Sequence, residues 1–314
     1  MRKSVIIQSP FKSISGYGLK ALDIVESIVE LYPQWNISLK LTSWGSNPNR
    51  EYTKLDHLLI DQITFQPDVF IQIGLPNEFQ PIGRDKNILF TSGIETSKAP
   101  KEWVEYMNLM DVTIVPSEFT KQSFLDSDVK PTKPIEVIFE GYDEEIYSPS
   151  KKTSFPLLDI KNDFVYLFVG QYTGGSVFGE DRKNIGNMIR IFLQTFANKV
   201  NPPALLIKSN MGNFSKVDQY QYLEFINTIK RTVDAKNLPD IYLLHGELSD
   251  QQMNGLYNNP KIKAMISLTK GEGFGRPLLE FATTGKPILV SNHSGHLDFL
   301  KPEHHTLLDG QLDT

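Results

Sequence analysis

The chain of 314 residues contains no cysteine, which excludes disulfide bonds, thiolate zinc sites and a cysteine nucleophile. Long apolar runs are absent as well, since no stretch approaches the roughly 20 residues that a membrane-spanning helix needs. Only Val-Ile-Ile precedes Gln8, which is too little apolar sequence for a secretory signal peptide. We therefore expect a cytoplasmic protein without a transmembrane segment, although peripheral membrane contact stays open.

Positive charge is not in excess. The formal net charge is -5, and 22% of the residues are charged, which is ordinary for a globular protein. A large basic surface for nucleic acid or anionic lipid is therefore not expected. The length is too great for one ordinary core and predicts two domains.

Short apolar runs alternate with helical patterns along the whole chain, which predicts an α/β fold with parallel sheets. The strands expected in the first half are Val5–Gln8, Ser38–Thr42, Asp68–Ile73, Asn87–Thr91, Asp111–Val115 and Ile135–Phe139, with helices at Leu19–Leu31, Lys101–Leu109 and Glu118–Leu125. Those expected in the second half are Phe164–Val169, Ala204–Lys208, Ile241–Leu244, Ala264–Leu268 and Ile288–Val290, with helices at Ile185–Ala197, Gln219–Val233 and Asp250–Tyr257.

A polar, proline-containing stretch interrupts this alternation and predicts a linker at about 148–162. We accordingly expect Rossmann-like domains at 1–150 and 151–314, with ligand in a central cleft at the carboxyl ends of the strands.

The segment 270–286 carries the most chemical information. Gly271, Gly273 and Gly275 predict a sharp turn between a buried strand and a short helix, and the exposed amides at such a helix start attract anions. Glu272 precedes the turn and Glu280 lies about one helical turn after it. Two hydrogen-bond acceptors on either side of an anion site suit a single ligand in which a diphosphate joins a sugar to a nucleoside. A surface glutamate and a glutamate that complements the helix dipole would fit the same spacing.

The string from Glu272 to Glu280 resembles the Glu-x7-Glu signature of family 4 glycosyltransferases, whose GT-B fold has two Rossmann-like domains. Other segments also resemble the family, so that the resemblance covers roughly residues 1–300. It implies transfer of a hexose-type sugar from a nucleotide-diphosphate sugar, with retention of configuration. It also implies that Glu280 binds the donor ribose, and that Glu272 with the backbone of Gly273, Phe274 and Gly275 holds the donor sugar and phosphate.

Cations are expected near the diphosphate, because the leaving group departs with negative charge. Lys183 and Arg182, before a predicted helix, are the first candidates, and Lys208, at the end of a strand, is a weaker one. Solvated surface cations would give the same pattern. The resemblance places an arginine where this chain has Gln171, so the sequence departs from the family there.

Three residues of the first domain are further candidates. Gly16 and Gly18 lie in a loop before a helix, where family members approach the donor phosphate and the acceptor, although a plain turn is an equal alternative. Glu95 lies in a stretch that resembles the acceptor edge of some relatives, which makes it a candidate base or hydroxyl ligand. A glutamate at a helix start is the rival interpretation.

No metal or other cofactor is expected. The histidines lack a companion carboxylate pattern for zinc, and we expect them in surface loops. Asp126-Ser-Asp128 superficially matches the Asp-x-Asp motif of metal-dependent transferases, but it follows a predicted helix instead of ending a strand.

The leading hypothesis is thus a metal-independent, retaining glycosyltransferase that uses a UDP-, GDP- or ADP-linked sugar and an unknown hydroxyl acceptor, for which a glycan is the first expectation. One alternative is a protein of the same fold that binds nucleotide sugars with little turnover. A dinucleotide-dependent oxidoreductase is a weaker alternative, because a full Gly-x-Gly-x-x-Gly after the first strand is missing.

Overall fold

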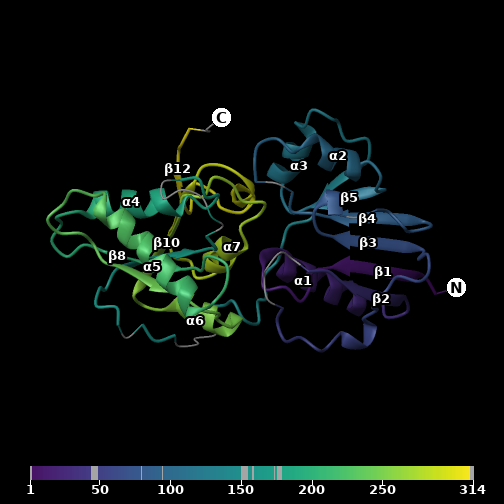
Figure 1. Ribbon diagram of the computed structural model, residues 1–314, viewed down its shortest axis with the longest axis horizontal. Coiled ribbons are helices and arrows are strands. Elements are labelled where there is room, and N and C mark those ends of the chain that lie inside the picture. Colours follow the sequence, from purple (N-terminus) through teal and green to yellow (C-terminus); the bar gives the residue numbers. More distant parts are fainter. Residues whose placement is uncertain are drawn as a thin grey trace. The chain divides into compact units, whose positions relative to one another are not determined.

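A computed structural model describes residues 2–43, 49–78, 80–93, 95–149, 155–157, 159–172, 174 and 179–311. The chain forms two compact units, Met1–Glu140 and Gly141–Thr314. Each unit contains one parallel, six-stranded sheet with helices on its faces (Figure 1). The α/β prediction with parallel sheets is confirmed. The predicted linker falls partly on residues 150–154 and 158, which lie outside the described residues.

Unit 1 has the strand order β2-β1-β3-β4-β5-β6. Its strands are β1 (Ser4–Ser9), β2 (Asn36–Leu41), β3 (Val69–Ile73), β4 (Lys86–Phe90), β5 (Val112–Val115) and β6 (Ile135–Val137). Its helices are α1 (Gly16–Leu31), α2 (Lys101–Met107) and α3 (Glu118–Leu125), with short 3-10 turns η1 (Asp56–Leu58) and η2 (Pro76–Glu78).

Side chains alternate across this sheet, so each face packs against different helices. Ala21 and Val25 of α1 pack with Val5 and Ile7 on one face. Residues of α2 and α3 pack on the opposite face with Leu89.

Unit 2 has the strand order β12-β11-β10-β7-β8-β9. Its strands are β7 (Val165–Val169), β8 (Ala204–Lys208), β9 (Ile241–Leu244), β10 (Ile262–Ser267), β11 (Ile288–Ser291) and β12 (Thr306–Leu308). Its helices are α4 (Ile185–Phe196), α5 (Lys216–Arg231), α6 (Asp250–Asn258) and α7 (Arg276–Ala282), followed by the 3-10 turn η3 (Gly295–Asp298).

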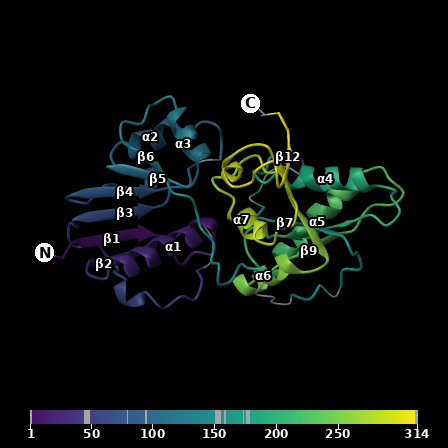
Figure 2. The same ribbon diagram turned by 180° about the vertical axis from the view of Figure 1, so that it is seen from behind.

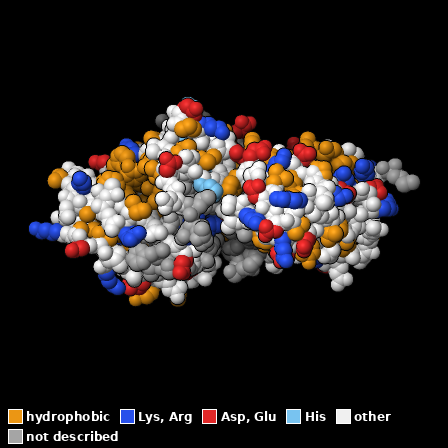
Figure 3. Space-filling view, turned by 90° about the horizontal axis from the view of Figure 1, so that it is seen from above, with side chains coloured by type: hydrophobic (Ala, Val, Ile, Leu, Met, Phe, Trp, Pro, Cys, Tyr) orange, Lys and Arg blue, Asp and Glu red, His pale blue; other side chains and the backbone are white. Residues whose placement is uncertain are grey.

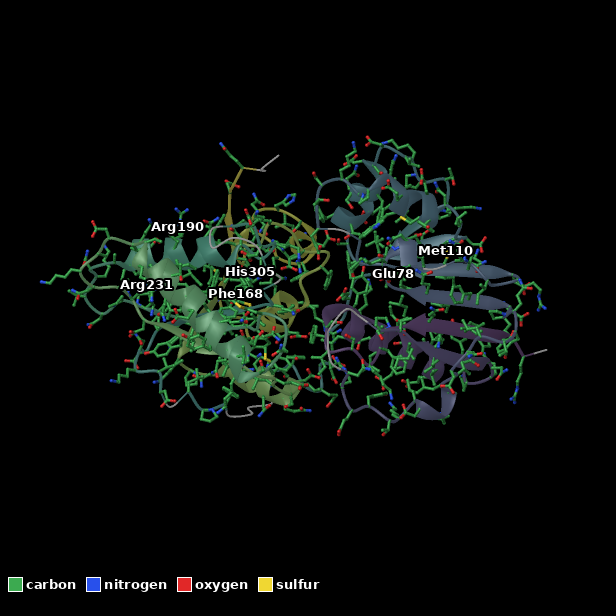
Figure 4. All side chains as sticks on the ribbon, viewed as in Figure 1. Glu78, Met110, Phe168, Arg190, Arg231 and His305 are labelled. Carbon is green, nitrogen blue, oxygen red and sulfur yellow. The ribbon has the colours of Figure 1, made fainter. Side chains whose placement is uncertain are left out.

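Two cores flank the sheet of unit 2. Helices α4 and α5 cover the face that carries Phe168, and α6 and α7 cover the face that carries Val165 and Leu167. Figures 1 and 2 show these helix pairs from opposite sides, and Figure 4 labels Phe168, which packs with residues of α4 and α5. The chain therefore continues on opposite faces of the sheet after β7 and after β10.

Two helices start earlier than predicted, for the same reason. The side chain of Ser15 accepts a hydrogen bond from the Gly18 amide, so α1 begins at Gly16 instead of Leu19. The side chain of Ser215 likewise accepts from the Asp218 amide, so α5 begins at Lys216 instead of Gln219. Serine caps of this kind satisfy amides that a helix start leaves unpaired, and hydrophobic periodicity alone does not reveal them.

Candidate active site

The best-placed site in unit 2 lies where neighbouring strands lead to opposite faces. The chain runs outward from β7 to β8 and β9, and then returns to β10 on the other side of β7. Loops after β7 and β10 therefore diverge, and such switch points at the carboxyl ends of strands are where α/β sheets bind ligands. The two loops contain Arg182, Lys183 and Glu272, which the sequence predicted as site residues.

The segment after β10 forms the predicted turn and short helix. Gly275 caps α7 with φ at 99°, a conformation that strains residues with a side chain, and Pro277 lies in the first turn. A side chain at Gly275 would also come within 3.2 Å of the His296 Cβ atom. This position therefore requires glycine for both its backbone conformation and its surroundings.

The carboxylate of Glu272 binds two cations from the loop after β7. Lys183 donates a hydrogen bond to Glu272 Oε1, and Arg182 Nη1 lies 3.4 Å from Oε2 and 3.0 Å from the Gly271 carbonyl oxygen. Glu272 is 8% exposed, and burial by itself would raise its pKa. The charges of Lys183 and Arg182 outweigh burial, so the pKa of Glu272 is lowered. These three side chains together carry a net charge of +1 near neutral pH.

The turn that carries Glu272 is supported by the segment after β11. The Glu272 amide donates to Ser294 Oγ at 2.9 Å, and the Gly295 amide donates to the Glu272 carbonyl at 2.9 Å. A Cβ atom on Gly295 would lie 2.2 Å from the Gly273 carbonyl oxygen, so this close approach requires glycine. The sequence analysis did not predict a role for Ser294 or Gly295. The only local indication of one is that a serine and a glycine stand together before His296.

His296 corrects the expectation that the histidines lie in surface loops. Its side chain is 0% exposed, and its Nε2 atom lies 2.8 Å from the Ser291 carbonyl oxygen. Burial lowers the pKa of His296, which favours the neutral imidazole despite the nearby Glu272 charge. His296 lies in η3, which follows β11, and it packs against the turn that carries Glu272.

Glu280 projects from α7 into a second polar cluster. Tyr257 Oη donates to its Oε2 atom at 3.3 Å, and Arg276 Nε lies 3.2 Å from Oε1. Glu280 is 6% exposed, and burial raises its pKa to about 7 even though Arg276 opposes the shift. Each carboxylate oxygen can accept more than one hydrogen bond, so these contacts leave acceptor capacity for ligand hydroxyls.

The remaining candidates of unit 2 are distributed along the same strand ends. Lys208 ends β8 and donates to the Gly246 carbonyl at 2.7 Å, and burial lowers its pKa. Within the described residues, no contact joins Lys208 to Glu272. Gln171 follows the end of β7, where the resemblance predicts an arginine, and Thr173 and residues 175–178 lie outside the described part of the chain.

In unit 1, the two predicted glycines have different surroundings. A Cβ atom on Gly18 would lie 1.9 Å from the Ser13 carbonyl oxygen, so packing of the helix start requires this glycine. At Gly16 such an atom would meet nothing within 4 Å. Gly16 is therefore the position of the pair where a ligand has room to approach.

Glu95 lies near Tyr17, which is partly buried. Tyr17 Oη is 3.1 Å from Thr91 Oγ1 and accepts a hydrogen bond from the Ser92 amide at 2.8 Å. Burial raises the pKa of Tyr17, and the charge of Glu95 adds to that rise. The acceptor-side role of Glu95 stays a prediction.

The described residues contain no group of three or more histidines and carboxylates able to hold a metal ion. Asp126 caps the end of α3, as the sequence analysis expected for a residue after a helix, and Asp128 pairs with Lys98. In the part of the chain that the structure describes, no helix is long and apolar enough to cross a membrane. Charges of both signs are interspersed among the described side chains on the face seen in Figure 3.

Comparison with solved structures identifies similar chains with the same architecture. HepE from Anabaena, solved with UDP and glucose, has a TM-score of 0.65 at 15% identity, and the match covers 96% of this chain and 83% of HepE. Sucrose-phosphate synthase from Thermosynechococcus elongatus has a TM-score of 0.65 at 12% identity, with 99% and 86% covered. WaaG, a glycosyltransferase involved in lipopolysaccharide biosynthesis, has a TM-score of 0.64 at 12% identity, with 99% and 87% covered.

The curated proteins contain no significant match to this sequence. A family model described as Glycosyl transferases group 1 matches residues 224–310, which include α6, α7 and both glutamates of the signature. The chain therefore has the GT-B fold, and its residues 224–310 match the glycosyltransferase group 1 model.

Proposed function

We propose that this protein is a retaining glycosyltransferase that moves a hexose-type sugar from a nucleotide-diphosphate sugar to a hydroxyl acceptor without a metal ion. The observation that best supports this proposal is the position of the Glu272 carboxylate. It lies between Lys183 and Arg182 at the switch point of the sheet of unit 2, the unit that contains the glycosyltransferase group 1 match. The proposal assigns the donor sugar to Glu272 and the backbone amides of residues 273–275.

In the proposed mechanism, Lys183 and Arg182 neutralise the negative charge of the diphosphate. As the sugar–phosphate bond breaks, the diphosphate gains negative charge, and positive groups already in place stabilise that charge most effectively. Arg182 is 33% exposed at its side chain, so an incoming diphosphate can reach it from solvent. With two cations beside the diphosphate, the proposed reaction needs no metal.

Retention requires the acceptor to attack from the side that the diphosphate leaves. In the proposed mechanism a diphosphate oxygen takes the proton of the acceptor hydroxyl on that side. No protein nucleophile is then required. Glu95, if it contacts the acceptor, would orient the hydroxyl or assist this proton transfer.

Glu280 is assigned to the donor ribose. Replacing Glu280 with alanine should weaken nucleotide-sugar binding by about 1.5–3 kcal/mol, the range for hydrogen bonds to a charged group. Calorimetry with the full chain measures this change, and Glu224→Ala, which changes a glutamate on α5 with a 45% exposed side chain, is the matched control. Unchanged affinity in Glu280→Ala would remove the ribose assignment.

A panel of UDP-, GDP-, ADP- and dTDP-sugars tests the function itself by release of free nucleotide. UDP-hexoses come first, because HepE was solved with UDP and glucose. Release that continues in the presence of a chelator supports the proposal. Binding without release favours the second candidate, a nucleotide-sugar-binding protein with little turnover, for which Gln171 in place of the family arginine is the specific observation.

A further inference from the structure

Tyr257, near the end of α6, makes a direct contact with Glu280 of α7. The two helices cover the same face of the unit 2 sheet (Figure 2). Tyr257 is 0% exposed, and its hydroxyl oxygen lies 3.3 Å from Glu280 Oε2, although the two residues are 23 positions apart in the chain. Burial and the charge of Glu280 raise the pKa of Tyr257, so the phenol keeps its proton and donates it to the carboxylate. The sequence analysis assigned no role to Tyr257.

The position of Tyr257 is fixed on several sides. Lys286 Nζ donates a hydrogen bond to the Tyr257 carbonyl oxygen at 2.6 Å. The tyrosine ring packs edge-on against Phe281 at 5.6 Å between ring centroids, and its centroid lies 6.1 Å from that of Tyr147. A fully buried ring in a close-packed core has little freedom to change its orientation. Its hydroxyl group is therefore a donor at a fixed point beside Glu280.

The two oxygens of Glu280 are held from two different helices. Tyr257 of α6 donates to Oε2, and Arg276 of α7 lies 3.2 Å from Oε1 through its Nε atom. A carboxylate that is anchored at both oxygens has a defined plane, and each oxygen keeps capacity for a further hydrogen bond. Arg276 alone would leave the Oε2 side without a fixed donor. The tyrosine thus determines which way that side of the carboxylate faces.

A tyrosine also differs from a second cation, because it orients the carboxylate without neutralising it. The charges that act on Glu280 come from Arg276 and Asp250, and of these only Arg276 is positive. The ionised cluster is therefore negative, whereas the cluster of Glu272 with Lys183 and Arg182 is positive. A negative cluster disfavours a phosphate but readily accepts hydrogen bonds from neutral hydroxyl groups. The surroundings of Glu280 accordingly suit a diol.

We propose that Tyr257 is a positioning residue, which holds the Glu280 carboxylate in the orientation that accepts hydrogen bonds from the ribose hydroxyls of the donor. This inference rests on the proposed function, which assigns the donor ribose to Glu280. Because Tyr257 is fully buried, it acts on the ribose only through Glu280. Loss of its hydroxyl group should weaken the ribose contact and leave the contacts to the diphosphate unchanged.

Calorimetry with the full chain tests this role. The probes are UDP, ADP and GDP, each beside its 2′-deoxy form, so that the members of a pair differ by one ribose hydroxyl. The unchanged protein should bind the ribonucleotide of its preferred base about tenfold or more tightly than the 2′-deoxy form, as expected for a hydrogen bond to a charged group. In Tyr257→Phe this ratio should fall to about threefold or less, because the ribonucleotide binds more weakly while the 2′-deoxy form binds as before.

Tyr222→Phe is the matched control. Tyr222 is also 0% exposed, but it lies on α5, on the opposite face of the unit 2 sheet. This variant should keep the full preference for the ribonucleotide, and thermal melts should show that both variants fold. An unchanged preference in folded Tyr257→Phe, or an equal fall in Tyr222→Phe, would overturn the proposal.

Steady-state kinetics provides a second readout. Tyr257→Phe should raise the KM for the nucleotide sugar about tenfold and change kcat by less than about threefold, because the ribose is held equally before and during bond breakage. General distortion of the site would also disturb Lys183 and Glu272 and would lower kcat. A fall in kcat with an unchanged KM would therefore contradict a positioning role at the ribose.

These measurements separate the role of Tyr257 from the proposed function. A ribonucleotide preference that disappears in Tyr257→Phe, in a protein that never releases nucleotide from a sugar donor, would refute the transferase and preserve the role of Tyr257. Sugar transfer with an unchanged preference in Tyr257→Phe would refute that role and preserve the transferase. Absence of any preference in the unchanged protein would refute the ribose assignment of Glu280 and the role of Tyr257 together.

Discussion

Each unit buries a lysine against a glutamate, but the two pairs differ in balance and access. In unit 1, Lys20 Nζ lies 3.7 Å from Glu140 Oε1, and the side chains are 5% and 9% exposed. In unit 2, Lys183 and Glu272 are 12% and 10% exposed, and Arg182 adds a second cation that is 33% exposed. One buried lysine paired with one buried glutamate has no net charge and therefore does not attract an anion. A cation in excess of the carboxylate that is exposed to solvent does attract one. Excess charge and access, and not burial of an ion pair alone, distinguish the candidate site.

The largest effect should come from breaking the pair of unit 1. Lys20→Met leaves the Glu140 carboxylate buried without this cation, and removal of one partner of a buried pair costs about 3–5 kcal/mol of stability. Urea unfolding of the full chain measures the loss. Lys101→Met, at an exposed position of α2, should stay within about 0.5 kcal/mol of the unchanged protein.

The double variant Lys20→Met/Glu140→Leu sharpens this test, because replacing both charges with apolar groups removes the uncompensated carboxylate. It should recover much of the stability lost by Lys20→Met. Equal unfolding midpoints for Lys20→Met and Lys101→Met would contradict a structural role for the pair.

Breaking the pair of unit 2 should instead reduce turnover. Lys183→Ala should lower kcat by about a hundredfold to a thousandfold, the range for removing one group that stabilises developing charge. Steady-state nucleotide release measures this, with Lys216→Ala, an exposed residue of α5, as the control. An unaltered rate in a folded Lys183→Ala protein would exclude Lys183 from the mechanism.

The two glutamates of the signature should respond to pH in opposite directions. Burial raises the pKa of Glu280 from 4.5 to about 7, so the folded state binds its proton more tightly than the unfolded state, and stability is lost as pH rises between these values. For Glu272, burial acts in the same direction but Lys183 and Arg182 lower its pKa, so its contribution is lost as pH falls.

Glu280→Gln cannot ionise and isolates the first effect. Between about pH 5 and about pH 8 its stability should rise relative to the unchanged protein by on the order of 2 kcal/mol. Chemical unfolding at several pH values provides the measurement. A difference that does not change with pH would show that Glu280 keeps an ordinary pKa in the folded state.

The smallest effect is expected at Gly16. A side chain there meets no atom within 4 Å, and alanine favours a helix more than glycine does, so Gly16→Ala should fold normally. If a ligand approaches this backbone, the variant should lose a few-fold in activity with no loss of stability. Equal activity and equal melting temperature would leave Gly16 outside the site.

Much of the fold followed from local patterns. The turn and helix after β10 were predicted from glycine and proline positions, and both structural features are confirmed. Alternation of apolar runs also predicted the strands of both sheets except β12, where Leu307 and Leu308 are the only apolar residues and no longer apolar run marks the strand. The starts of α1 and α5 were wrong because their serine caps act through side chains outside the periodic pattern.

The candidate site was only partly predictable. Glu272, Lys183 and Arg182 were chosen from motifs, but their mutual contacts span 89 or 90 positions of sequence. The buried His296 was expected at the surface, because nothing local reveals that η3 packs against the Glu272 turn.

Local patterns were enough to predict the α/β class, the strand-turn-helix segment and its two glutamates, because hydrogen-bonding periods and backbone preferences are local properties. Which charges meet depends on the folded chain, since the order of strands in a parallel sheet brings loops together regardless of their separation in the chain. It also set the opposite pKa shifts of Glu272 and Glu280, which depend on burial and on neighbouring charges that only the folded chain provides.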